Sequence, residues 1–164
     1  MAVQRSKAAQ AAALLGFLAM TAGAAALGSW ATFSGLRDWY ASLRKPSWTP
    51  PSWLFGPVWT VLYALMAVAA WRVWRRLDDE PKARKEALAC WGFQLALNAA
   101  WSWLFFGFRQ PTLAFFELLS LWLVILATLV SFARIDRPAA ALLVPYLAWV
   151  TFAGALNGAI ARLN

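Results

Sequence analysis

Two amide side chains stand at helical spacing within a long apolar stretch of the sequence. Gln94 and Asn98 are four residues apart, and Trp101 and Phe105 continue the series at steps of three and four. In a helix, these four side chains share one face. Amides in an apolar environment need partners, which are either other helices or a polar ligand. The spacing leaves both alternatives open, and Asn98, one turn from Trp101, is the better candidate for contact with a ligand.

Two further stretches combine aromatic residues with small or polar ones at helical spacing. Trp59 and Tyr63 are four residues apart. The other stretch has steps of three and four and consists of Tyr146, Trp149, Ala153 and Asn157. One such stripe alone is more often ordinary core. Three that converge favour a pocket for a flat, conjugated, largely apolar molecule such as a tetrapyrrole or a sterol, because π-systems stack on aromatic faces.

Other kinds of chemistry are excluded or restricted by residue type. The chain has no histidine and a single cysteine, Cys90. We therefore expect no metal site and no disulfide within the chain, and we interpret Cys90 as a small apolar packing residue. A Ser-His nucleophile is impossible, and the sequence has no Walker-type phosphate loop.

Glu117 is the one acid within a long apolar run. It is either a functional carboxylate, as in a proton-coupled transporter, or a group close enough to the membrane interface to reach water or Arg109.

Composition places the chain among membrane proteins. Of its 164 residues, 62% are hydrophobic and 13% are charged, whereas about a quarter of the residues in a soluble domain are charged. The formal net charge is +8, but the basic residues form short clusters between apolar runs. This pattern indicates membrane topology and lipid contact, and we expect no nucleic-acid partner.

Five apolar runs are long enough to cross a bilayer of about 30 Å, which takes about 20 helical residues. They cover about residues 8–28, 54–76, 86–107, 112–134 and 138–162. The first run follows Arg5 and Lys7, as a signal-peptide core also does, but its length favours a retained helix. The sequence thus predicts an all-α integral membrane protein, with residues 1–164 forming a single transmembrane domain built as a five-helix bundle.

The segment between the first two spans, residues 29–53, is rich in tryptophan and proline in its second half. Indole rings favour the membrane interface, and proline fixes φ and removes backbone donors. We expect a stiff lid loop here, with a short amphipathic turn over residues 35–43.

The distribution of basic residues predicts an orientation. Ten of the 15 Lys and Arg residues lie on the side of the N-terminus, including those of a loop of mixed charge over residues 77–85. In a bacterial cell membrane, which we expect, this places the N-terminus in the cytoplasm and the lid outside. An outer membrane is the alternative, and the charge count does not apply there.

Blocks of residues across positions 10–164 resemble those of one known family. They are Trp39-Tyr40, the run from Lys45 to Pro51, Trp59, the helical series Gln94, Asn98 and Trp101, Phe106-Gly107, Arg109-Gln110, Pro145-Tyr146, Trp149, Ala153 and Leu156-Asn157. In this order they resemble the tryptophan-rich sensory protein and translocator protein family (TspO/MBR, peripheral benzodiazepine receptor-like). The resemblance implies a five-helix membrane bundle. Its first loop would close a pocket for porphyrins and for synthetic isoquinoline carboxamide and benzodiazepine ligands.

The resemblance also implies site residues and partners. The implied pocket positions are Tyr40, Pro50, Trp59, Tyr63, Asn98, Trp101, Trp149 and Ala153, and the stripe described above adds Tyr146. Trp59 and Trp149 match a pair associated in some bacterial members with light- and oxygen-dependent porphyrin breakdown, which makes them candidate catalytic residues. Homodimers are usual in the family, often through the third helix. The sterol motif of mitochondrial members needs a tyrosine that the stretch from Leu156 to Arg162 lacks.

The expected function is that of a membrane receptor or sensor for tetrapyrroles such as protoporphyrin IX or haem, bound noncovalently and linked to stress or pigment regulation. Light- and oxygen-dependent porphyrin degradation is a second hypothesis. The alternatives are a small transporter of tetrapyrrole intermediates or lipophilic compounds, with Glu117 as the coupling carboxylate, and a purely structural membrane protein.

Overall fold

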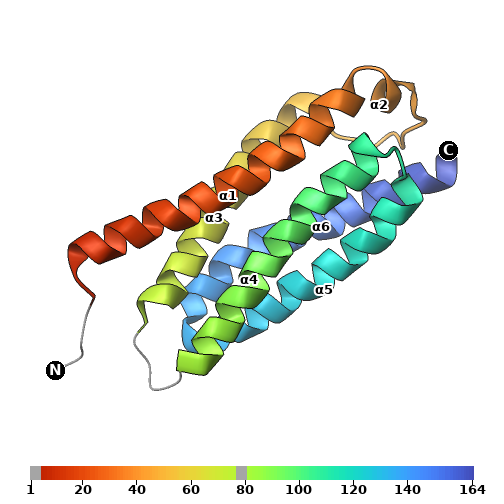
Figure 1. Ribbon diagram of the computed structural model, residues 1–164. Helices are drawn as coiled ribbons and strands as arrows, with labels where there is room; N and C mark the ends of the chain where they lie inside the picture. The colour runs from red at the N-terminus through yellow and green to blue at the C-terminus, as the bar shows by residue number, and fades with distance from the viewer. Residues whose placement is uncertain (1–4, 77–80) are drawn as a thin grey trace.

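The computed structural model describes residues 5–76 and 81–164, and the regular structure of these residues is helical. The elements are α1 (Lys7–Leu36), α2 (Trp39–Ser42), the 3₁₀ turn η1 (Ser52–Leu54), α3 (Phe55–Arg75), α4 (Pro81–Ser102), the π-helical turn η2 (Trp103–Gly107), α5 (Pro111–Ile135) and α6 (Arg137–Leu163). The long helices run roughly side by side in an elongated bundle (Figure 1). The α2 segment, the α4–α5 turn and the C-terminus lie at one end, which we call the α2 end.

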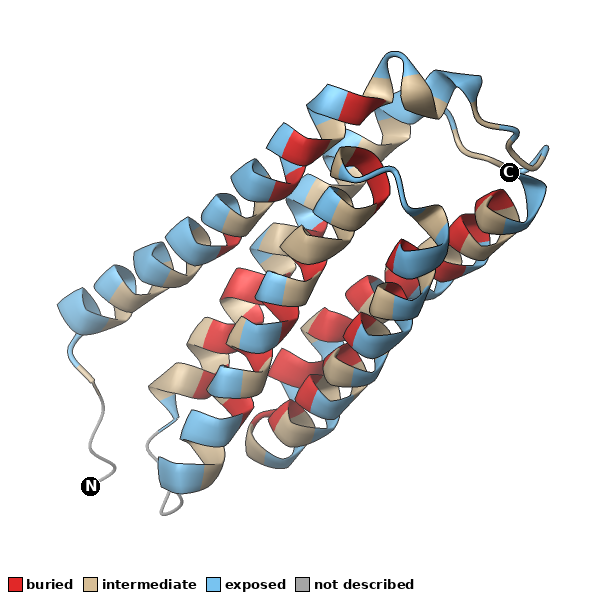
Figure 2. Cartoon of the chain, turned by 45° about the vertical axis from the view of Figure 1, so that its right-hand side comes forward, coloured by how far each residue is buried: buried red, intermediate tan, exposed pale blue. Residues whose placement is uncertain are grey.

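Four of the described helical stretches are long and apolar enough to cross a membrane. They are Lys7–Leu36, Ser52–Arg75, Pro111–Ile135 and Arg137–Leu163. Helix α4 is less apolar, because its first two turns carry Lys82, Arg84, Lys85 and Glu86. Figure 2 shows that the first half of α1 is largely exposed, and the exposed side chains there include Leu15 and Met20. In a bilayer these apolar surfaces face lipid rather than water, and the chain is a multi-pass membrane protein.

Helix α1 extends eight residues beyond the predicted span, so the prediction that the lid loop begins at residue 29 is wrong. The small residues Gly28 and Gly35 lie within the helix and do not end it. Because they lack a side chain, they allow α1 to approach α4 and η2 closely. A Cβ added at Gly28 would lie 3.1 Å from Ser102 Oγ, and one at Gly35 would lie 2.6 Å from the carbonyl oxygen of Phe106. Packing therefore holds residues 29–36 in a helix.

Helix α4 begins at Pro81, five residues before the predicted start. Proline suits the first turn of a helix because its missing N–H has no partner there in any case. Of the mixed-charge loop predicted over residues 77–85, residues 77–80 lie outside the described part of the chain and the rest is helical. At its other end, α4 continues into η2, where the Phe108 N–H bonds to the Trp103 carbonyl at 2.7 Å. Residues 35–43, predicted as a turn, contain the end of α1 and the single turn α2.

The core between α3, α4 and α6 is formed by large side chains, and several of their polar groups bond to neighbours within it. Met66, Trp91 and Tyr146 are each at most 1% exposed. The Trp91 indole N–H donates to the carbonyl of Met66 at 3.1 Å, and Gln94 Nε2 contacts Met66 Sδ at 3.5 Å. Gln94 thus serves helix packing, which is one of the two alternatives that its spacing left open.

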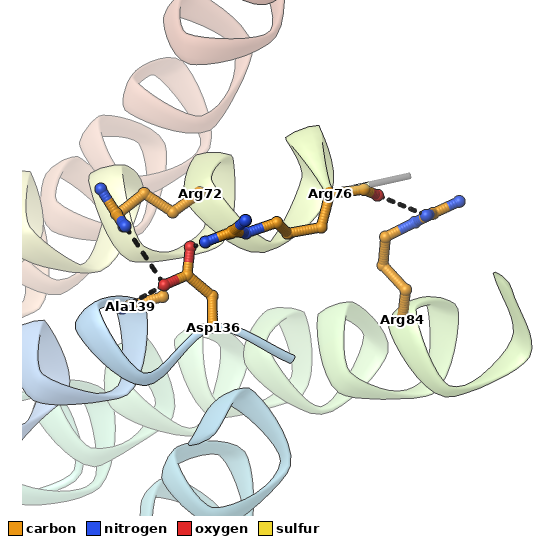
Figure 3. A network of polar contacts seen from close by, with 5 residues as sticks. All are labelled: Arg72, Arg76, Arg84, Asp136 and Ala139. Atoms are coloured by element: carbon orange, nitrogen blue, oxygen red, sulfur yellow. Dashed lines mark hydrogen bonds and ion pairs between the residues drawn. The ribbon is translucent and has the colours of Figure 1, made fainter. Parts of the chain in front are cut away.

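Asp136 ties three helices together at the end opposite α2 (Figure 3). Its carboxylate accepts from Arg72 and Arg76 of α3, each at 3.2 Å, and from the N–H of Ala139 at the start of α6. Burial alone raises the pKa of Asp136, but the hydrogen bonds from Arg72 and Arg76 outweigh it and hold this pKa below its ordinary value. This ion-pair cluster fixes the α5–α6 corner against α3.

Candidate ligand-binding site

A cavity of about 390 Å³ lies in the α2-end half of the bundle. Its walls come from α1, α2, α3, α4, η2 and α6, together with Ser52 of η1. Its size falls in the range of small-molecule sites, about 300–1,000 Å³. Its lining is mainly aromatic and aliphatic with a few hydroxyls and amides, a composition that suits a flat apolar molecule with a few polar groups.

Three polar side chains from three helices form a hydrogen-bonded series at the cavity wall. The Tyr63 hydroxyl of α3 donates to Asn98 Oδ1 of α4 at 2.6 Å. Asn98 Nδ2 donates in turn to the Tyr146 hydroxyl of α6 at 3.0 Å. Asn98 and Tyr63 line the cavity, whereas Tyr146 lies fully buried behind them. The amide of Asn98 still has one N–H and one lone pair to offer a ligand.

The indole of Trp101 is held in place from two sides. Its ring stacks on Phe105 with centroids 5.3 Å apart and an interplanar angle of 24°. Its N–H donates to Asn157 Oδ1 of α6 at 3.0 Å. Trp101, Phe105 and Asn157 all line the cavity. Contacts within the chain therefore position this face of the cavity without a ligand.

Aromatic side chains from α3 and α6 form the facing walls. Trp59 packs against Tyr63 at 5.5 Å between centroids, and Trp149 packs edge-on against Phe55 at 5.8 Å. Both indoles line the cavity, together with Ala153, one turn along α6 from Trp149. The small side chain of Ala153 leaves room between the large rings.

The α2 segment contributes Tyr40 to the cavity lining, and the Tyr40 ring lies 5.6 Å from that of Phe106. Burial raises the pKa of the Tyr40 hydroxyl, so this group stays neutral at physiological pH. Lys45 stabilises the segment: its ammonium donates to the carbonyls of Tyr40 and Leu43 at 2.7 and 3.1 Å and lies 4.7 Å from the Tyr40 ring centroid. These contacts hold Tyr40 in position.

Further along, the connection to α3 is bound to α6. Two hydrogen bonds join the backbone of Arg44 to the Asn164 side chain, at 3.0 and 2.9 Å. The Trp48 ring packs against Phe152 with centroids 5.8 Å apart. The segment between α2 and η1 is thereby attached to α6 next to the cavity.

Seven of the nine predicted ligand-binding residues lie together around this cavity, and two do not. The seven are Tyr40, Trp59, Tyr63, Asn98, Trp101, Trp149 and Ala153. Pro50 is half-buried but does not line the cavity, and Tyr146 supports Asn98 from behind. The candidate catalytic pair, Trp59 and Trp149, is among the seven.

The sequence did not predict the contribution of α1. Its last turns supply Gly28, Ser29, Thr32, Phe33 and Leu36 to the cavity lining. Residues 29–36 were predicted to belong to the lid loop, so no helical face was assigned to them. Ser29 and Phe33 of α1, and Gly56 and Thr60 of α3, are exposed as well as lining. The cavity therefore opens sideways between α1 and α3.

These features define a class of protein: a helical multi-pass membrane protein with an aromatic cavity at one end of the bundle. Within the described residues, no group of three or more His, Cys, Asp or Glu side chains is arranged to hold a metal ion.

Comparison with known proteins identifies the family. Residues 16–163 match the TspO/MBR family, and the chain belongs to this family. The chain is 42% identical over 130 residues to the tryptophan-rich protein TspO of Chlorobaculum tepidum, covering 77% of this chain and 79% of that protein. It is 44% identical over 126 residues to protein CrtK of Rhodobacter capsulatus, covering 77% and 78%. It is also 44% identical over 130 residues to the translocator protein of Homo sapiens, covering 79% and 76%. The family resemblance of the tryptophan and proline blocks is confirmed.

Proposed function

We propose that this protein is a membrane receptor or sensor that binds tetrapyrroles, such as protoporphyrin IX and haem, in the cavity between α1, α3, α4 and α6. Ligand occupancy then links tetrapyrrole levels to stress or pigment regulation. The observation that carries the proposal is the convergence of three indoles, Trp59, Trp101 and Trp149, on one cavity. Names of relatives such as tryptophan-rich sensory protein support the sensing role.

The chemistry of the cavity suits a planar macrocycle. Ring faces from opposite helices offer stacking surfaces on both sides of a flat guest. Asn98 supplies the polar group that orients the ligand. Haem iron would find no imidazole ligand because the chain has no histidine, so recognition rests on the macrocycle.

We further infer that α4 is a fifth membrane span and that the α2 segment acts as a lid. Helix α4 and η2 run continuously from Pro81 to Gly107, which at about 1.5 Å per residue is long enough for a bilayer core of about 30 Å. The bonds of Lys45 and Arg44 support a stiff closure rather than a loose loop. The excess of basic residues at the end opposite α2 supports a cytoplasmic N-terminus in a bacterial cell membrane, with the lid outside.

The test is an equilibrium titration of the full chain in lipid nanodiscs with protoporphyrin IX. Tryptophan fluorescence reports binding directly, because three of the twelve tryptophans line the cavity. We expect saturable quenching at one site per chain. Quenching that rises linearly with porphyrin and matches that of empty nanodiscs would reject the proposal.

Trp59 and Trp149 support a second, narrower proposal, which is porphyrin degradation under light with molecular oxygen as the oxidant. Both indoles lie at the same cavity and each contacts a further aromatic ring. In this proposal the protein holds the macrocycle beside side chains that can be oxidised.

A further inference from the structure

Glu117 of α5 is a buried carboxylate without a partner. Both of its carboxylate oxygens are shielded from solvent and accept no hydrogen bond from the residues that the structure describes. Arg109, which the sequence suggests as a possible partner of Glu117, forms none of the ion pairs found among the described residues. Isolated charge is costly at such a position, and acids within membrane spans commonly mark proton or ion sites.

Helix α5 packs closely on α6 next to Glu117. A Cβ added at Gly154 would lie 3.1 Å from Leu118 Cδ2, and one at Gly158 would lie 3.0 Å from Phe115 Cε2. These two α5 residues flank Glu117 in sequence. The small residues of α6 thus allow α5 to approach closely on both sides of the carboxylate. Gly154 and Gly158 therefore serve packing between two helices of the same chain.

Tyr146 provides an electrostatic link between this carboxylate and the cavity. The carboxylate of Glu117 is close enough for its charge to act on the Tyr146 hydroxyl. That hydroxyl accepts a hydrogen bond from Asn98, and its own proton is not used in any hydrogen bond among the described residues. Asn98 lines the cavity. A hydrogen bond therefore links Tyr146 to the ligand site through Asn98, and the charge of Glu117 acts on Tyr146 without a hydrogen bond between them.

The groups that could titrate together with Glu117 are few. Helix α5 carries no other acid or base before Arg134. Tyr146 of α6 lies within range of the charge of the carboxylate, and Tyr63 of α3 lies beyond Asn98. On α4, Cys90 lies away from it, against Val124 and Thr128, which are about two and three turns further along α5.

We propose that Glu117 is a proton-binding site coupled to the cavity, so that the protein binds its tetrapyrrole more tightly when Glu117 is protonated. This inference rests on the proposed function. When Glu117 is ionised, its negative charge acts on the Tyr146 hydroxyl and makes the Tyr146 oxygen a stronger acceptor for Asn98 Nδ2. That holds the Asn98 amide away from a ligand. The negative charge also repels the carboxylates of a porphyrin.

Coupling of this kind is reciprocal. If a proton on Glu117 strengthens ligand binding, ligand binding must draw a proton from solution onto Glu117. Calorimetry in buffers of different ionisation enthalpy measures this uptake without assuming where the proton goes.

The affinity test compares the wild type with Glu117→Gln, a neutral mimic of the protonated acid, in nanodiscs with protoporphyrin IX as the probe. Between about pH 5 and about pH 9, we expect wild-type affinity to fall about fivefold or more relative to that of Glu117→Gln, which should remain the tighter binder at high pH. Because the carboxylates of the probe titrate identically with both proteins, only the difference between them is assigned to Glu117. Glu86→Gln, at an exposed acid of α4, should behave as the wild type. Parallel pH profiles for wild type and Glu117→Gln would overturn the coupling.

A readout without porphyrin separates this proposal from the proposed function. Infrared difference spectra of the unliganded protein should show a protonated carboxyl band that Glu117→Gln removes. Tyr146→Phe should retain that band but lose the pH dependence of binding, which also covers the case that Glu117→Gln does not fold. Absence of the band at every pH would refute proton binding by Glu117. If the band is present but the wild type binds no porphyrin at any pH, the proposed function and the coupling fail while the proton site stands.

Discussion

The indole N–H of Trp101 donates a 3.0 Å hydrogen bond to Asn157 Oδ1, and Asn157 Nδ2 donates a 2.7 Å bond to the carbonyl of Pro111. One amide of α6 thereby joins the cavity wall on α4 to the first residue of α5. Because Trp101 and Asn157 both line the cavity, this bond stabilises the bundle and also sets the position of a ring available to the ligand.

Replacing Trp101 by phenylalanine tests this double role. Trp101→Phe leaves Asn157 Oδ1 without its donor, so we expect the free energy of unfolding to fall by about 1–2 kcal/mol and the protoporphyrin affinity to fall as well. Trp122→Phe is the matched control, because it also removes an indole hydrogen bond, 2.8 Å to Thr151 Oγ1, but away from the cavity. It should lose stability and keep its affinity. Equal affinities of the two variants would contradict a role of Trp101 in binding.

Gly35 marks the closest approach of α1 to the cavity wall. A Cβ at this position would meet the carbonyl oxygen of Phe106 at 2.6 Å, a backbone atom that cannot move aside alone. Gly35→Ala should therefore destabilise the protein by about 1–3 kcal/mol and weaken porphyrin binding. Gly23→Ala, where the added Cβ meets nothing within 4 Å, should be neutral or slightly stabilising because alanine favours helix. Thermal unfolding in nanodiscs measures both, and equal melting temperatures would show that the approach is not tight.

The Asp136 cluster predicts a pH dependence of stability. The pKa of Asp136 is lowered in the folded protein, so its contribution is fully present above the ordinary value of 3.8 and is lost as the pH falls through the lowered value. At neutral pH, Asp136→Asn should lower the free energy of unfolding by about 1–3 kcal/mol, because Arg72 and Arg76 are only partly buried. The difference from the wild type should vanish in strong acid. Glu86→Gln, which removes an exposed pair with Lys82 at 3.9 Å, should change stability little. A difference for Asp136→Asn that persists undiminished in strong acid would refute the assignment.

Light-dependent bleaching of bound protoporphyrin tests the narrower proposal for Trp59 and Trp149. If these indoles take part in oxidation, Trp59→Phe and Trp149→Phe should slow bleaching in the presence of oxygen while retaining most of the bound porphyrin. The measurement is the loss of porphyrin absorbance under constant illumination, normalised to bound ligand. Trp122→Phe serves as the control, since Trp122 does not line the cavity. Unchanged bleaching rates in both variants would contradict a chemical role of Trp59 and Trp149 and leave them only a role in binding.

Much of the fold and of the candidate site was predictable because the aromatic and amide side chains recur at helical spacing. The stripes containing Asn98, Trp101 and Trp149 follow helical spacing, so their faces could be assigned from sequence alone, and the structure brings them to one cavity. The extent of α1 was not predictable in this way. Gly35 resembles a helix breaker in sequence, and only the contact with Phe106 reveals why the helix continues. The shielding of the Glu117 carboxylate likewise depends on tertiary packing, in which its neighbours Leu118 and Phe115 lie against Gly154 and Gly158 of α6.

The central claim, that a flat ligand occupies the space between α3, α4 and α6, is tested most directly by a matched pair of substitutions on α6. Ala153 lines the cavity, whereas Ala148 is exposed on the same helix. In nanodisc titrations with protoporphyrin IX, we predict that Ala153→Leu weakens binding by about tenfold or more, about 1.4 kcal/mol, and that Ala148→Leu leaves the dissociation constant unchanged. Wild-type affinity in Ala153→Leu would place the ligand elsewhere and contradict the account.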